Sequence, residues 1–227
     1  MKLIETILNL LFPPKCPFCG RVLEEVSICS DCEKTLPWTE ETLAERKLAG
    51  GLRVAAPLWY EEAVRDGLLR LKFCGGSAAA VPLGEVVARC AAERFSGEFD
   101  TVTWVPVSRK RLRKRGYDQA ELLARAMCRQ WNVRPERLLV KTVDNPAQSG
   151  IHDAAARRAN VLGVYDPAGD AAGRRILLVD DICTTGATLT ECARVLRDAG
   201  AADVVCVAVA FARERKDSGK VHKSPEE

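Results

Sequence analysis

Hydrophobic and polar positions form blocks along the chain that predict strands and helices in alternation. Short, nearly continuous apolar runs predict buried strands at residues 54–60, 101–107, 137–142, 175–179 and 204–210. Longer segments with apolar residues every three or four positions predict helices at residues 62–73, 78–95, 118–131 and 188–199. Because strands that alternate with helices usually pair in parallel, this order predicts an α/β fold with a parallel sheet flanked by helices. We expect this domain to span residues 52–212.

The apolar run that ends at residue 179 leads directly into polar residues that can bind a ligand. Two carboxylates, Asp180 and Asp181, come first, and a turn of small residues then precedes a helix: Thr184, Thr185, Gly186, Ala187 and Thr188. Ligands of open α/β sheets bind at the carboxyl ends of strands, and the free N–H groups of a helix N-terminus favour a phosphate. Carboxylates at this place could accept hydrogen bonds from sugar hydroxyls or bind Mg²⁺. The stretch therefore predicts a site for a phosphorylated sugar.

A strand, a turn and a helix without any ligand is the alternative, because aspartate and threonine are common in turns and helix caps. The ordered combination favours the ligand site, since two adjacent acids at the end of a buried strand are costly without partners. The stretch is not a Walker A loop for ATP, because it contains no Gly-Lys-Ser/Thr sequence.

Four of the ten cysteines are spaced for a metal ion. A disulfide or a redox-active pair is the alternative, but two Cys-x-x-Cys pairs only nine residues apart favour a tetrahedral zinc site made by Cys16, Cys19, Cys29 and Cys32. Because thiolates fill all four positions, we expect a structural zinc ion and a zinc-binding module at residues 1–40. The other cysteines are expected to be small buried apolar side chains: Cys74, Cys90, Cys128, Cys183, Cys192 and Cys206.

The predicted strand at residues 101–107 is also expected to end in a functional loop. Six of the seven residues from 109 to 115 are cationic, for which a solvated basic face is the alternative. The carboxyl end of a strand would bring this loop near the phosphate turn, where its cations could neutralise a pyrophosphate or follow a nucleic-acid backbone. The candidate residues, which include one aromatic ring that could stack on a base, are Ser108, Arg109, Lys110, Arg111, Arg113, Arg115 and Tyr117.

Composition says more about the cellular compartment of the protein than about its function. The 227 residues are 47% hydrophobic and 29% charged, as in an ordinary globular protein, and the formal net charge is only +3. Overall charge therefore does not indicate a nucleic-acid-binding protein. No export signal is recognisable and no apolar run is long enough to span a membrane, so we expect a cytoplasmic protein. Residues 213–227 are predicted to be a disordered charged tail.

The strand, the two acids and the turn resemble the phosphoribosyl pyrophosphate (PRPP) loop of type I phosphoribosyltransferases. In that family the acids contact the ribose 2′- and 3′-hydroxyls, and the loop holds the 5′-phosphate. The resemblance implies a type I phosphoribosyltransferase-like fold, with Asp180 and Asp181 as ribose-binding and catalytic residues. It also implies that the turn from Thr184 to Thr188 holds the 5′-phosphate and that Mg²⁺ binds together with PRPP.

Four blocks of sequence together resemble the ComF family of late-competence proteins. They are the paired Cys-x-x-Cys motifs, residues 69–76, residues 105–121 and the PRPP loop. A fifth block, at residues 148–161, fits the mobile loop that the family has before its last core strands. The chain departs from the family pattern at Tyr117-Asp118, where Phe-Asn is more frequent, and at Ile151-His152, where Leu-Ser is usual.

This resemblance implies a protein that binds PRPP and takes part in natural transformation by handling incoming single-stranded DNA. Its expected partners are the DNA-uptake machinery, including a helicase, which would bring the cytoplasmic protein to the inner face of the membrane. An active phosphoribosyltransferase of nucleotide metabolism, similar to amidophosphoribosyltransferases and using PRPP and Mg²⁺, is the alternative. A regulatory PRPP sensor, which binds without chemistry, is the third possibility. The sequence leaves all three open, because no acceptor site is recognisable in it.

Overall fold

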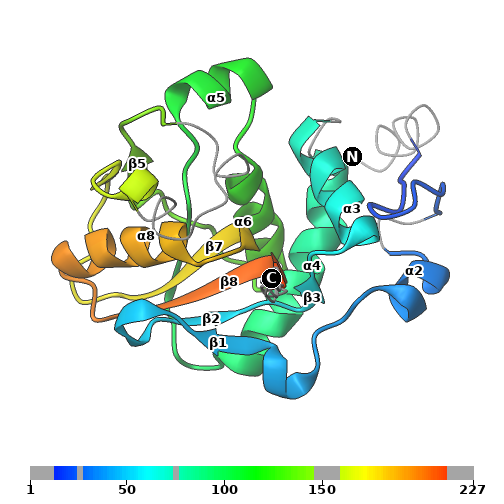
Figure 1. Ribbon diagram of the computed structural model, residues 1–227, viewed down its shortest axis with the longest axis horizontal. Helices are drawn as coiled ribbons and strands as arrows, with labels where there is room; N and C mark the ends of the chain where they lie inside the picture. Colours follow the sequence, from blue (N-terminus) through cyan, green and yellow to red (C-terminus); the bar gives the residue numbers. More distant parts are fainter. Residues whose placement is uncertain (1–12, 25–27, 74–76, 146–158, 214–227) are drawn as a thin grey trace, which may run out of the picture.

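The computed structural model describes residues 13–24, 28–73, 77–145 and 159–213, and its centre is a mostly parallel sheet (Figure 1). The strands follow the order β1-β2-β8-β7-β4, and β3 pairs with the end of β8. Their bounds are β1 Glu45–Lys47, β2 Arg53–Ala55, β3 Leu58–Trp59, β4 Thr101–Trp104, β7 Arg175–Cys183 and β8 Asp203–Phe211. Every pairing in this sheet is parallel except that of β1 with β2. The expected parallel α/β sheet is confirmed.

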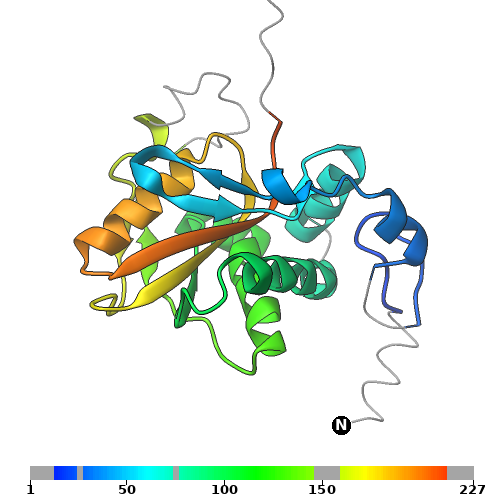
Figure 2. The ribbon, with the colours of Figure 1, turned by 90° about the horizontal axis from the view of Figure 1, so that it is seen from below.

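Both faces of the sheet are covered, which explains the continuous apolar runs of its central strands. The helices are α2 Ser30–Thr35, α3 Glu62–Phe73, α4 Ser77–Arg94, α5 Arg109–Arg115, α6 Gln119–Gln130 and α8 Ala187–Asp198. Along β7, Leu177 and Val179 belong to the core that includes α3, α4 and α6, whereas Ile176 and Leu178 belong to the core that includes α8. Figure 2 shows α4 and α6 side by side against the sheet and the N-terminal part beyond α3. The alternation of side chains along β7 therefore separates two hydrophobic cores.

Three short strands differ from the prediction. The predicted strand at residues 137–142 exists as β5 Leu139–Lys141, but it pairs antiparallel with β6 Tyr165–Pro167 in a separate two-stranded sheet. Strand β1 lies between the predicted limits of the zinc module and of the α/β domain, where no strand was predicted. Neither β1 nor β6 contains an apolar run, since only Tyr165 among their residues is buried. Their pairing partners, rather than their own sequences, make them strands.

The prediction of a basic loop after β4 is wrong, because the basic residues form helix α5. Ser108 caps this helix, with its Oγ accepting a hydrogen bond from the backbone N–H of Arg111 (3.3 Å). Gly116 ends the helix with a φ of 83°, in the left-handed region that favours glycine. Arginine, lysine and leucine all have high helix propensity, and cations in the last turn suit the negative end of the helix dipole.

Asp118 ties together the two ends of the basic segment. Its carboxylate accepts hydrogen bonds from the backbone N–H of Val107 (2.8 Å), before α5, and from that of Ala120 (3.0 Å), in the first turn of α6. Burial raises the pKa of Asp118 to about 6, and the N–H groups that it accepts from oppose this rise. These hydrogen bonds fix the residues on both sides of α5, which lies above α6 in Figure 1.

Several expectations concern residues outside the described part of the chain. They are Cys74, most of the predicted mobile loop and nearly all of the predicted charged tail. The domain limits 1–40 and 52–212 stay predictions. Five of the six cysteines outside the predicted zinc site are described, and all five are buried free thiols, as expected: Cys90, Cys128, Cys183, Cys192 and Cys206. Within the described ranges, no helix has the length and hydrophobicity needed to cross a bilayer.

Candidate functional site

Asp180 and Asp181 lie within β7, near its carboxyl end, rather than after it. The strand continues to Cys183 because Ile182 and Cys183, beyond the two acids, still pair with β8. Both carboxylates are buried, with exposed fractions of 8% and 6%, and the backbone N–H of Asp181 donates to Asp180 Oδ1 (2.8 Å). Successive side chains of a strand point to opposite faces, so the two acids face different neighbours. Asp181 faces α3, and Asp180 faces the turn before α8.

The neighbour of Asp181 is Lys72, the next-to-last residue of α3. Its Nζ forms an ion pair with Asp181 Oδ2. Burial raises the pKa of Asp181, but the charge and hydrogen bond of Lys72 outweigh it and leave the pKa below its usual range. Burial lowers the pKa of Lys72, and Asp181 more than compensates for it. Burial and the charge of Asp181 raise the pKa of Asp180 well above its usual range. The site therefore holds one ionised carboxylate against a lysine and one carboxylate that readily takes up a proton.

Lys72 was not among the predicted site residues. It stands at the end of an amphipathic helix, where a lysine is usually solvated, so no local pattern distinguishes it. The signal that could have found it is its place in the block at residues 69–76, which carries part of the family resemblance.

The turn between β7 and α8 forms a small cradle. A cavity of about 20 Å³ is lined by Asp180, Ile182, Cys183, Thr184, Gly186, Ala187, Thr188 and Leu189. Gly186 has a φ of 73° and stands at the start of α8, a helix of 12 residues. Leu48, from the connection between β1 and β2, covers it: a Cβ at position 186 would lie 2.4 Å from Leu48 Cδ1. Conformation and crowding thus both require glycine at this position. Thr185 belongs to the same turn, and its Oγ1 accepts from the N–H of Ala187 (3.4 Å).

Some cations of α5 form ion pairs within the protein and others do not. Lys110 Nζ and Arg111 Nε lie 3.5 and 4.0 Å from the carboxylate of Asp144, which also accepts a hydrogen bond from Ser108 Oγ. The Ser108 hydrogen bond, followed by the charges of Lys110 and Arg111, lowers the pKa of Asp144. Among the described residues, Arg109 and Arg113 have no ion-pair partner. These two arginines are therefore the ones most available to an external anion.

The far end of α5 contacts the end of α3. The guanidinium of Arg115 lies 5.4 Å from the ring centroid of Phe73 and also donates to Gln119 Oε1. The hydroxyl of Tyr117 donates to the backbone carbonyl of Leu71 (2.9 Å). Because the residue between Leu71 and Phe73 is Lys72, the basic segment and the acid pair meet at this end of α3. The structure thus brings the two predicted groups of residues to the same helix end.

The four cysteines of the predicted zinc site converge. The Sγ atoms of Cys16, Cys19, Cys29 and Cys32 all lie within 4.8 Å of one another, and those of Cys19 and Cys29 are 3.6 Å apart. Zn–S distances of about 2.3 Å imply tetrahedral S–S separations of about 3.8 Å, so this cluster fits zinc with little adjustment. Burial raises the pKa of Cys16, but backbone N–H groups nearby lower it to about 7, which favours the thiolate that a metal needs. Four clustered thiols fit a structural zinc site.

The cysteine cluster packs on α3, the same helix that carries Lys72. Arg70 donates from Nη1 to the backbone carbonyls of Pro17 (2.8 Å) and Phe18, both between the first two cysteines. Gly67 allows this approach, since a Cβ there would lie 3.0 Å from Phe18 Cδ1. One helix therefore connects the cysteine cluster to the acid pair.

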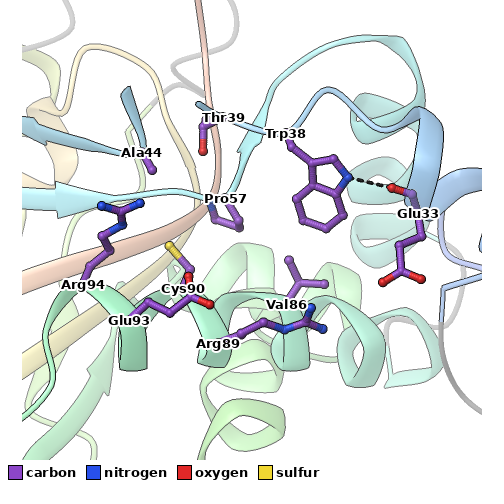
Figure 3. A pocket seen from close by; sticks show the side chains of 10 residues that line it. All are labelled: Glu33, Trp38, Thr39, Ala44, Pro57, Val86, Arg89, Cys90, Glu93 and Arg94. Carbon is purple, nitrogen blue, oxygen red and sulfur yellow. Dashed lines mark hydrogen bonds between the residues drawn. The ribbon is translucent and has the colours of Figure 1, made fainter. Parts of the chain in front are cut away.

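A larger cavity lies elsewhere and contains none of the predicted site residues. It has a volume of about 370 Å³ and lies between the segment around Trp38 and helix α4 (Figure 3). The indole N–H of Trp38 donates to the backbone carbonyl of Glu33 (2.7 Å), which fixes the ring at the edge of this cavity. Arginines and glutamates share its rim: Glu33, Arg89, Glu93 and Arg94. This mixed charge does not favour an anionic ligand.

Two family models match the chain. A phosphoribosyl transferase domain matches residues 115–224, and a double zinc ribbon domain matches residues 7–46. Together with the parallel sheet and the cysteine cluster, these matches confirm the expected phosphoribosyltransferase-type fold and the N-terminal module with its structural zinc site.

Curated relatives extend over most of the chain. It is 27% identical over 188 residues to the competence protein ComFC of Bacillus subtilis, which covers 82% of this chain and 73% of that protein. It is 30% identical over 191 residues to the competence protein ComFC of Streptococcus pneumoniae, covering 83% and 77%. It is also 27% identical over 195 residues to the DNA utilization protein YhgH of Escherichia coli, covering 83% and 80%.

Proposed function

The chain belongs to the ComF family, to which its ComFC relatives belong, and from this we propose that it binds Mg²⁺-PRPP at the β7–α8 site and handles single-stranded DNA during DNA uptake. The observation that carries the first part is the pair of buried acids directly before a glycine-containing cradle at a helix N-terminus. The names of the relatives, with the exposed cations of α5, support the second part.

The chemistry of PRPP fits the residues present. Asp180 and Asp181 can accept hydrogen bonds from the ribose hydroxyls, in addition to those that they already accept from the Asp181 N–H and from Lys72. The cradle around Gly186 offers backbone N–H groups and the positive end of α8 to the 5′-phosphate. Mg²⁺ prefers carboxylate and phosphate oxygens, and Lys72 is a cation already at Asp181 that could face the pyrophosphate.

A phosphoribosyl transfer reaction is the second candidate. The observation that favours it is that both acids of the ribose site are present and that one of them has a raised pKa. With the ribose fixed there, Mg²⁺ and the cations of α3 and α5 would stabilise the pyrophosphate as it leaves. Release of pyrophosphate from PRPP with a base or an amine as acceptor distinguishes this activity from binding alone.

Calorimetric titration with Mg²⁺-PRPP tests the ligand site. We expect Asp180→Asn, which keeps the shape of the side chain, to weaken binding by about 10-fold or more, because an NH2 group replaces one of the two oxygens that can accept from a ribose hydroxyl. We expect Gly186→Ala to weaken it at least as much, since the new Cβ would clash with Leu48 and the turn would have to shift.

The matched control for the second variant is Gly97→Ala. Gly97 has the same φ of 73°, but a Cβ there would have no neighbour within 4 Å. Both alanines therefore carry the same backbone strain, and only position 186 adds crowding at the cradle. Unchanged affinity in Asp180→Asn and Gly186→Ala, or no binding by the unmodified protein, would exclude this site for PRPP.

Neutralising the free arginines of α5 tests the role in DNA handling. The double variant Arg109→Gln and Arg113→Gln is expected to weaken binding of a single-stranded oligonucleotide. It should also reduce the slope of log K against log salt by about 1.4, since each phosphate contact on a single strand contributes about 0.7. The control with the same charge change is Arg129→Gln with Arg134→Gln, at the opposite end of α6, and it should leave the slope unchanged. Equal slopes for the two double variants would reject α5 as the backbone-binding element.

A further inference from the structure

Phe73 is far more exposed to solvent than the phenylalanines of the core. It is the last residue of α3 and is 70% exposed, whereas Phe95 and Phe211 are fully buried. A side chain that is 70% exposed gains little free energy from burial. Because the exposed ring directly follows Lys72, the partner of Asp181 in the candidate site, we consider a functional use for it.

The surroundings of the ring are cationic and held in place. The Arg115 guanidinium lies 5.4 Å from its centroid, a cation–π contact, and Arg115 is oriented in turn by Gln119. Tyr117 fixes the end of α3 through the carbonyl of Leu71. Arg113, two residues before Arg115 on α5, is exposed. An aromatic ring among positioned cations is the combination that binds single-stranded nucleic acids, in which bases stack on rings and phosphates contact cations.

The ring also belongs to the residue that follows Lys72, the ion-pair partner of Asp181. The residue before it, Lys72, forms the ion pair with Asp181, and consecutive Cα atoms are only about 3.8 Å apart. A base on Phe73 would therefore lie at the end of α3 that carries the partner of Asp181, while its strand follows α5. Tyr117, the aromatic residue predicted to stack, is half-buried and uses its hydroxyl within the protein.

We propose that Phe73 is a stacking platform for one nucleobase of a single DNA strand, with Arg115 against the same ring and the adjoining phosphates on α5. This inference rests on the proposed function in DNA handling and names the contact that would bind a base. A purely apolar partner is disfavoured, because Arg113, Lys114 and Arg115 all belong to the same helix end and would have to be desolvated. A free nucleobase has the same ring chemistry, and the experiment separates it from a strand.

The test compares variants of the full-length protein by fluorescence anisotropy with a labelled oligothymidine and with an abasic strand of the same length. We expect Phe73→Ala to weaken oligothymidine binding by about 10-fold, within the range for loss of one stacked base, and to leave abasic-strand binding unchanged. Phe73→Trp should retain or increase the affinity, because tryptophan offers a larger stacking surface. The matched control is Leu69→Ala, one turn earlier on α3 and 37% exposed, which should bind like the unmodified protein.

The outcomes are decisive in both directions. Equal affinity of Phe73→Ala and Leu69→Ala for oligothymidine overturns the proposal, and so does an equal loss on both strands, which would indicate a backbone or folding effect. Saturable binding of free thymine that displaces the oligonucleotide, and that Phe73→Ala abolishes, would assign the ring to a free base and also overturns it. If the unmodified protein binds neither strand, the DNA-handling function itself fails, whereas the Mg²⁺-PRPP titration still reports on the ligand site.

Discussion

Replacing Lys72 by methionine is expected to lower the free energy of unfolding by about 3 kcal/mol at pH 7.5, because it leaves Asp181 as a buried charge without its cation. The side chain of Asp181 is only 9% exposed and that of Lys72 is 23% exposed, so water replaces the lost ammonium poorly. The value is at the lower end of the range for broken buried ion pairs, since Lys72 keeps some access to solvent. Urea unfolding of the two proteins measures the difference.

The effect of this substitution should depend on pH in a defined direction. In the unmodified protein the pKa of Asp181 is lowered, so its contribution to stability is present above the unfolded value of about 3.9 and is lost as pH falls through the folded pKa. In Lys72→Met, burial without a cation raises that pKa instead, and stability is lost as pH rises above the unfolded value. The two unfolding curves should therefore lie closer together at pH 4.5 than at pH 7.5.

Two further variants make the interpretation specific. Lys72→Arg keeps a cation at this place and should retain most of the stability. Asp181→Asn removes the buried charge and leaves Lys72, which can turn toward solvent, so its loss should be smaller than that of Lys72→Met. A difference between Lys72→Met and the unmodified protein that does not change with pH would contradict an ion-pair origin and indicate lost packing alone.

The parts of the fold that could be read from the sequence are those set by local patterns. Strands β7 and β8 are buried on both faces, so their apolar runs are unbroken, and the cradle between β7 and α8 is contiguous in the chain. The four cysteines could be recognised for a similar reason, because Cys-x-x-Cys spacing alone brings two thiolates to one metal. These features need no knowledge of distant contacts.

The parts that could not be read depend on tertiary contacts. The ion pair of Lys72 with Asp181 joins the end of α3 to β7. The sequence around either residue contains no signal of this contact. The short strands β1 and β6 exist through their partners. For α5, two ordinary helix signals were present: Ser108 before the helix and Gly116 after it. The density of positive charge nevertheless favoured a loop.

Helix α3 connects the zinc module to the ligand site, so we expect the module to affect ligand binding as well as its own folding. Arg70 donates to the backbone carbonyls of Pro17 and Phe18, and two residues later Lys72 contacts Asp181. The cysteine cluster therefore supports the helix end that places Lys72 and Phe73. A loss of order in the cluster should spread to the ligand site through this helix.

Removing zinc is accordingly expected to unfold the N-terminal module and to weaken Mg²⁺-PRPP binding by about 10-fold. Structural zinc sites in small modules contribute roughly 10–16 kcal/mol to folding, more than so short a segment can obtain from packing. Cys16→Ser should reproduce both effects, with one zinc ion lost per chain by metal analysis. Cys90→Ser, at a buried cysteine outside the cluster, should keep the zinc and the affinity.

Arg70→Gln separates the support of α3 from the metal itself. It removes the donor to the two carbonyls but leaves all four thiolates in place, so it should retain the zinc ion and still lose PRPP affinity. If Arg70→Gln binds PRPP like the unmodified protein while Cys16→Ser does not, the module acts on the site by a route other than this helix. If neither variant changes the affinity, the cysteine cluster and the ligand site are independent, and the contact of Arg70 with the module serves only to join them.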